Sequence, residues 1–162
     1  MIENLPRFPG AIWLTLLIGL GLNNIPLPPE WAYWRPDFLV LSLIHWALAM
    51  RQNVSLFIAF FMGLLADTIT YSLLGQHALG YVLVTYFAVR LSLRMSAAAF
   101  LQQFALIFIV VGIFMLINLW IRGVTGNVGP GLLYWMPLLS SLLVWPIYHG
   151  ILGYFYMPRK MV

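Results

Sequence analysis

Long apolar stretches separated by short polar breaks dominate the pattern of this chain. Six of these stretches approach or reach the ~20 apolar residues that a helix needs to cross a bilayer. These breaks consist of turn residues, as at Pro9-Gly10, or combine a turn residue with charge, as at Arg122-Gly123. The pattern predicts an all-helical, polytopic integral membrane protein with a single membrane domain over residues 1–162. The predicted spans are 11–27, 37–50, 55–74, 78–93, 100–121 and 132–157.

The second predicted span, 37–50, is short for a full crossing. Three explanations remain open at this stage. Residues 34–37 could form an outer turn of the same helix, the bilayer could thin around the segment, or the segment could be partly re-entrant.

Composition supports a membrane protein and excludes an ordinary soluble domain. Of the 162 residues, 63% are hydrophobic and only 7% are charged. A soluble domain carries about 25% charged residues, so this chain has too little polar surface to cover a water-exposed globule. The mean hydropathy of +0.95 agrees with that conclusion.

The distribution of basic residues predicts which side of the membrane holds the two chain ends. Six spans place both ends on the same side, and the basic residues then divide six to two between the sides. Because cytoplasmic loops are enriched in Lys and Arg, both termini are expected in the cytoplasm. The cytoplasmic set is Arg7, Arg51, Arg90, Arg94, Arg159 and Lys160, and the opposite set is Arg35 and Arg122.

Asp67 is the one charged residue in the apolar stretch 55–74. A carboxylate at such a depth costs roughly 2.5–3.5 kcal/mol on insertion scales, so it needs a partner, a proton or a function. One hypothesis pairs it with His45, although depths measured from the cytoplasmic loop differ by about 9 Å at 1.5 Å per residue. The alternatives are protonation of the carboxyl or local hydrogen bonds from Thr68, Thr70 or Tyr71.

The tripeptide Arg35-Pro36-Asp37 precedes the second span and has two interpretations. Pro36 restricts the backbone, and Asp37 suits the first turn of a helix, where the helix dipole favours a negative charge. With the aromatic residues before it, this segment is either a helix cap with an interfacial anchor or a docking rim for a partner outside the cytoplasm. Those aromatic residues are Trp31, Tyr33 and Trp34.

Ala59, Gly63 and Asp67 are spaced four residues apart and therefore share one helix face. Small residues at this spacing allow another helix to approach closely. The face is predicted to pack on protein, and the sequence leaves open whether that protein is the same chain or a partner.

The chain has no recognisable signature of catalysis. It contains no Cys, no HExxH pattern, no phosphate-binding glycine loop and no three metal-ligand residues at helical spacing. We therefore expect no enzymatic activity, no cofactor and no metal.

Three stretches in order resemble the MreD family of bacterial rod shape-determining membrane proteins. They are the motif 35–37 followed by the apolar run 38–46, the motif Gly63-Leu-Leu-Ala-Asp67, and the segment 74–81 that contains Gly75. The resemblance extends over nearly the whole chain, with the second half less specific. Arg35, Pro36, Asp37, Ala59, Gly63, Asp67 and Gly75 are the resulting candidates for motif or partner-packing residues.

The resemblance implies a non-enzymatic scaffold in the inner membrane that maintains rod cell shape through lateral peptidoglycan synthesis. Its implied direct partner is MreC, a bitopic membrane protein. Its implied indirect partners are the MreB filament, the glycosyltransferase RodA and a transpeptidase penicillin-binding protein.

The family also looks similar to substrate-binding membrane subunits of energy-coupling vitamin transporters, which implies an alternative. In that alternative the protein is a transporter or a small-ligand-binding subunit, with a polar cavity in its outer half. The polar residues predicted in that half are Asn23, Asn24, Asp67, His77 and Asn118.

Overall fold

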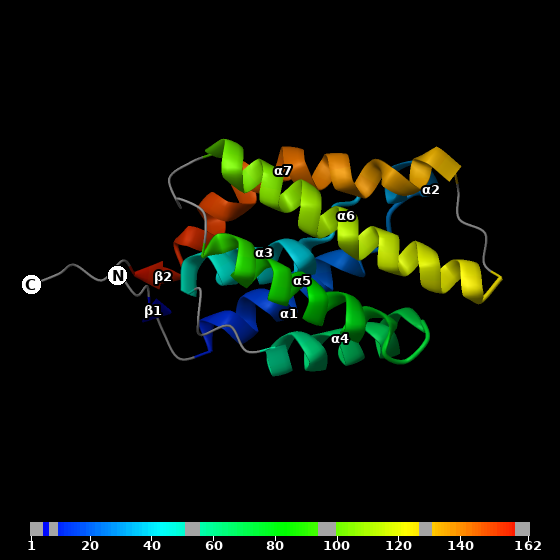
Figure 1. The fold of residues 1–162 in the computed structure, drawn as a ribbon, viewed down its shortest axis with the longest axis horizontal. Helices are drawn as coiled ribbons and strands as arrows, with labels where there is room; N and C mark the ends of the chain where they lie inside the picture. The colour runs from blue at the N-terminus through cyan, green and yellow to red at the C-terminus, as the bar shows by residue number, and fades with distance from the viewer. Residues whose placement is uncertain (1–4, 7–9, 51–55, 94–99, 127–130, 158–162) are drawn as a thin grey trace, which may run out of the picture.

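The computed structural model describes residues 5–6, 10–50, 56–93, 100–126 and 131–157, and these form a bundle of helices (Figure 1). The prediction of an all-helical protein is confirmed, apart from one pair of two-residue strands. The helices are α1 Ala11–Asn23, α2 Pro29–Ala32, α3 Phe38–Met50, α4 Leu56–Thr70, α5 Gln76–Ser92, α6 Phe100–Val124 and α7 Met136–Gly153, with the 3-10 helix η1 Gly131–Trp135 before α7. The strands are β1 Leu5–Pro6 and β2 Tyr156–Met157.

The strand pair holds the two ends of the described chain together. β1 and β2 are antiparallel, with Leu5 opposite Met157 and Pro6 opposite Tyr156. Residues 5–6 and 156–157 therefore lie at one end of the bundle, here called the terminal end (Figure 1). The opposite end, here called the distal end, holds α2, the turn at 71–75 and the end of α6.

Helix α3 lies at the centre of the bundle. Ten of its thirteen residues are buried, and it packs against α1, α5 and α7. Hydrogen bonds in the core also join it to its neighbours. For example, Trp46 Nε1 donates to Thr15 Oγ1 on α1 at 2.8 Å, and the hydroxyls of Ser42 and Tyr148 on α7 lie 2.7 Å apart. Because an unpaired buried polar group is costly, these bonds help to fix how the helices are placed around α3.

Several helices are shorter than the apolar stretches that contain them. Helix α1 ends at Asn23, before the prolines at 26, 28 and 29, and α4 ends at Thr70. Helix α3 has 13 residues and is about 20 Å long at 1.5 Å per residue, which is less than the ~30 Å of a hydrocarbon core. The predicted shortness of the second span is therefore present in the helix itself.

Within the ranges that the structure describes, two helical segments are long and apolar enough to cross a membrane, Leu101–Val124 and Gly131–Gly153. Helices α1, α3 and α4 are apolar but shorter.

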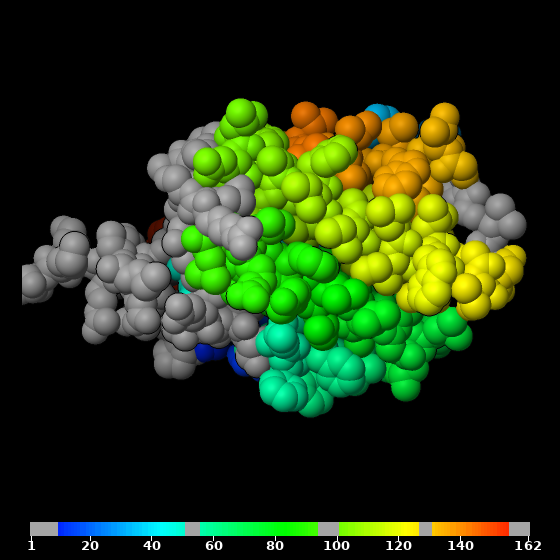
Figure 2. All heavy atoms as spheres, in the orientation of Figure 1, coloured from blue at the N-terminus to red at the C-terminus, as the bar shows by residue number. Residues whose placement is uncertain are grey.

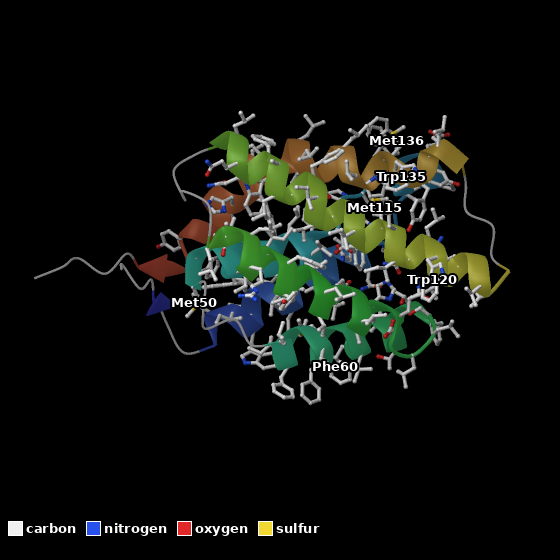
Figure 3. All side chains as sticks on the ribbon, viewed as in Figure 1. Met50, Phe60, Met115, Trp120, Trp135 and Met136 are labelled. Atoms are coloured by element: carbon white, nitrogen blue, oxygen red, sulfur yellow. The ribbon has the colours of Figure 1, made fainter. Side chains whose placement is uncertain are left out.

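The outer surface of the bundle is rich in large apolar side chains. Phe57 on α4 is 76% exposed, and Leu143 on α7 is 74% exposed. Figure 3 shows Phe60 pointing away from the bundle, and Figure 2 shows that α4, α5, α6 and α7 form the face turned to the viewer. Extended exposed apolar surface marks contact with a membrane or with other proteins.

Candidate functional site

Asp67 is buried near the distal end of α4 and accepts four hydrogen bonds. Its Oδ1 accepts from Ser72 Oγ at 2.7 Å and from the backbone N–H of His77 at 2.9 Å, and it lies 2.8 Å from His77 Nδ1. Its Oδ2 accepts from the backbone N–H of Gly75 at 2.8 Å. Both carboxylate oxygens are thus engaged by groups of the same chain within ten residues of Asp67.

The turn between α4 and α5 is what brings these donors to Asp67. Tyr71 has φ +52° and Gly75 has φ +98°, so the chain reverses through two left-handed residues. Gly75 is the N-cap of α5 and has no side chain to cap the helix, which leaves N–H groups of the first turn without a local acceptor. Asp67 accepts from two of these groups and so caps α5 from the neighbouring helix.

The face of small residues on α4 packs against α5 of the same chain. Ala59 and Gly63 are both buried. A Cβ added at Gly63 would lie 2.5 Å from the backbone nitrogen of Ala78 and closer still to its Cα. The predicted close approach of a helix on this face is therefore observed, and the helix that approaches is α5.

Asp37 caps the N-terminus of α3, as one of the two interpretations of its motif predicted. Its Oδ1 accepts from the backbone N–H of Val40 at 3.1 Å and from Asn23 Nδ2 at 2.7 Å, while Asn23 Oδ1 accepts from the N–H of Phe38 at 2.9 Å. Asn23 and Asp37 together join the end of α1 to the start of α3. Arg35 is held differently, because its Nη1 donates to the carbonyl of Ile25 at 3.0 Å.

A cavity of about 310 Å³ lies at the distal end, between the loop before α3 and the ends of α1, α4, α5 and α6. Its wall includes apolar side chains such as Leu20, Phe114 and Met115. Its polar and charged lining residues are Asn23, Asn24, Arg35, Asp37, Thr70, His77, Asn118, Arg122 and the aromatic Tyr33, Tyr81 and Tyr134. The cavity therefore combines an apolar wall with charged groups, a mixture typical of binding sites.

His45, which is buried, and His149, which is half-buried, form a second polar cluster in the half of the bundle nearer the terminal end. Their Nδ1 atoms lie 3.0 Å apart, and their ring centroids are separated by 4.7 Å. The ring of Trp145 packs on His149 at 4.8 Å. The contact joins α3 to α7.

The structure does not bring Asp67 and His45 together, and it gives each a different histidine as its partner. Asp67 lies three residues from the distal end of α4, whereas His45 lies in the second half of α3, which runs toward the terminal end. The local partners predicted for Asp67 are also replaced, since Thr68 and Thr70 donate to helix carbonyls of α4.

Sequence reasoning missed His77 and Ser72 as partners of Asp67. A signal for them exists: Gly75 begins a helix with no capping side chain, and His77 lies in its first turn. Among the described residues, no group of three or more His, Cys, Asp or Glu is placed to hold a metal ion. The arrangement is that of polar groups joining helices, with one cavity open to a binding partner.

Comparison with known proteins identifies relatives over most of the chain. A family model described as rod shape-determining protein MreD matches residues 7–155. The rod shape-determining protein MreD of Haemophilus influenzae is 30% identical over 143 residues, which cover 83% of this chain and 85% of that protein. No solved structure matches the chain.

Proposed function

The chain belongs to the MreD family of rod shape-determining proteins, and from this premise we propose that it is a non-enzymatic scaffold of the complex that builds the lateral cell wall. The single observation that carries the proposal is the match of the family model over residues 7–155. In this proposal the protein maintains rod shape by binding an MreC-like bitopic protein. Through that partner it is linked to MreB, RodA and a transpeptidase penicillin-binding protein.

We place the protein in the inner membrane as six spans with both termini in the cytoplasm. The β1–β2 pair supports an even number of spans, because it holds residues 5–6 beside residues 156–157 at one end of the bundle. Arg90 lies in the last turn of α5, whose direction carries it toward the terminal end, in agreement with the bias of basic residues. The distal end then faces away from the cytoplasm.

The contacts of the polar side chains between the helices support a binding function rather than a catalytic one. Asp67 accepts four hydrogen bonds from its own chain, and an ionised carboxylate offers about four acceptor sites. Asp37 caps α3, and His45 lies against His149. Each of these groups connects helices, which is the role expected of a scaffold that must present a fixed surface.

The surface that fits the partner best is the distal end. Trp31 is 65% exposed and Trp34 is 48% exposed, and both precede Arg35 on the border of the cavity. Exposed tryptophans are enriched at binding interfaces and at the membrane surface. We propose that the extracytoplasmic base of the partner contacts this rim, defined as residues 31–35, and the adjoining cavity.

The partner's own helix has to pack elsewhere than on the small-residue face of α4. Ala59, Gly63 and Asp67 are buried within the bundle, so this face is not available to another chain. Exposed apolar side chains on α4 and α7, such as Phe57 and Leu143, remain for contact with lipid or with a partner helix.

Co-purification after mild crosslinking tests the proposal. The protein, solubilised in detergent, is expected to retain the MreC-like protein of the same cell. The double variant Trp31→Ala, Trp34→Ala should lose most of the complex, whereas Trp13→Ala, an exposed tryptophan on α1 near the terminal end, should retain it. If the unmodified protein recovers no such partner, the scaffold function is wrong.

The cavity favours a second candidate function, a small-ligand-binding membrane subunit. Its volume of about 310 Å³ and its polar residues match that need. Of the five polar residues that the alternative named, Asn23, Asn24, His77 and Asn118 line the cavity, and Asp67 does not. Native mass spectrometry of protein released from membranes distinguishes the two. A small molecule retained at one copy per chain supports the second candidate, and a complex with an MreC-like protein and an empty cavity supports the first.

A further inference from the structure

More positively than negatively charged side chains line the distal cavity. Two arginines, Arg35 and Arg122, and one carboxylate, Asp37, contribute to its lining. Oδ1 of Asp37 already accepts from Val40 N–H and from Asn23. The ion pair found within the described part of the chain joins His77 to Asp67, so neither guanidinium has a carboxylate partner there.

Both arginines are held in place without being neutralised. Arg35 Nη1 donates to the carbonyl of Ile25 at 3.0 Å, and the guanidinium carbon of Arg122 lies 5.8 Å from the centroid of the Tyr134 ring. A backbone carbonyl and an aromatic face orient a guanidinium but carry no negative charge. Each guanidinium has five N–H donors, most of which remain for an occupant of the cavity.

Part of the remaining wall is apolar. Leu20, Phe114 and Met115 line the cavity beside the arginines, and Phe114 stacks on Tyr81 with ring centroids 5.4 Å apart. The amide of Asn118, by contrast, is already bonded to Gln76 and to the carbonyl of Phe114. The cavity thus presents an apolar surface and several polar side chains, His77 among them, next to two guanidinium groups.

We infer that the cavity binds an acidic side chain of the partner's segment just outside its membrane helix, with Arg35 and Arg122 as the binding residues and a neighbouring apolar side chain of that segment on the apolar wall. The inference rests on the proposed function, which brings that segment to the rim at 31–35. Guanidinium groups match carboxylate geometry with two parallel hydrogen bonds, so the arginines select an acidic residue over a neutral one. An anionic lipid headgroup is the competing occupant.

The first part of the test removes the positive charge of each arginine in turn. The protein is co-expressed with the full-length MreC-like protein, and association is measured on the purified complex. Arg35→Gln and Arg122→Gln should each weaken association by about tenfold or more, the scale of one hydrogen bond to a charged group. Arg90→Gln is the matched control, because Arg90 lies over the Tyr86 ring at 5.9 Å on α5 and outside the cavity lining. Thermal unfolding of all variants should be unchanged.

Charge exchange is the second part. Arg35→Glu should abolish association, and replacing one acidic residue of the partner's membrane-proximal segment by Lys should restore it. The inference is overturned if both Gln variants associate with the partner as tightly as the unmodified protein does, or if no Lys replacement in the partner restores the association of Arg35→Glu. Either result would leave the scaffold function intact. The cavity would instead be assigned to lipid if phosphatidylglycerol nanodiscs raise the unfolding temperature of the protein only when both arginines are present, and if the Gln variants leave the protein complex unchanged. Failure of the unmodified pair to associate would remove both proposals.

Discussion

Replacing Gly63 by alanine should push α4 away from α5, because the added Cβ has no room. It would lie 2.5 Å from the backbone nitrogen of Ala78, about 1 Å inside ordinary van der Waals contact. The obstacle is backbone, so no side-chain rotation can relieve the clash. The two helices have to separate, and a gap of 0.5–1 Å forfeits roughly a quarter to a half of the dispersion energy of each affected contact.

The expected cost is about 1–3 kcal/mol of unfolding free energy, the range found when extra methylenes are forced into a packed core. Alanine also favours a helix over glycine by about 0.8–1.0 kcal/mol, which partly offsets the clash. Gly150→Ala is the matched control, since a Cβ at Gly150 on α7 meets nothing within 4 Å. The difference between the two variants isolates the α4–α5 contact from helix propensity.

Thermal unfolding of the detergent-solubilised protein, followed by tryptophan fluorescence, measures this difference. For a chain of this size, each kcal/mol shifts Tm by roughly 2–4 °C. Because Asp67 lies one turn beyond Gly63, the separation should also loosen the contact between Asp67 and His77. If Gly63→Ala unfolds at the same temperature as Gly150→Ala, the close packing of α4 on α5 is wrong.

Three further substitutions and one topology measurement test other parts of the structure. The isosteric change Asp67→Asn replaces an oxygen that only accepts by an amide nitrogen that donates, so it should lower the unfolding free energy by about 1–3 kcal/mol. Ser141→Ala should cost less, because the hydroxyl of Ser141 makes no hydrogen bond in the described structure. Asp37→Ala should cost about 1 kcal/mol through loss of the α3 cap, with rescue by Asp37→Asn as the check. Gly75→Ala should destabilise by more than Gly21→Ala, because Gly75 has φ +98° and Gly21 is helical with open space around it. Reporter fusions at the two termini should both report the cytoplasm, and opposite locations would contradict six spans.

The sequence predicted those features that depend on neighbours along the chain. Asp37 follows a proline and precedes an apolar run, and this local order favours a helix cap, one of the two interpretations of the motif; the structure shows that cap. The spacing of Ala59, Gly63 and Asp67 likewise predicts a shared face. Which helix would cover that face could not be predicted, because spacing on one helix carries no information about its neighbour.

The partner of Asp67 could not be predicted from depths along straight helices. The estimate compared positions on α3 and α4 as if each helix ran the full length of its apolar stretch. Helix α4 instead ends at Thr70, and two left-handed residues return the chain toward Asp67. The donors at Gly75 and His77 come from this return, a feature of the turn that helical periodicity does not contain.

The lone carboxylate of an apolar helix therefore has a structural explanation that also connects it to function. Asp67 is buried and gives its acceptor capacity to the start of α5, so it is poorly placed to bind a diffusing ligand. His77, which it holds through Nδ1, is in turn a lining residue of the distal cavity. A substitution at Asp67 should consequently alter the position of His77 and so change the surface that the partner binds. It should do so even though Asp67 itself is not among the residues that line the cavity.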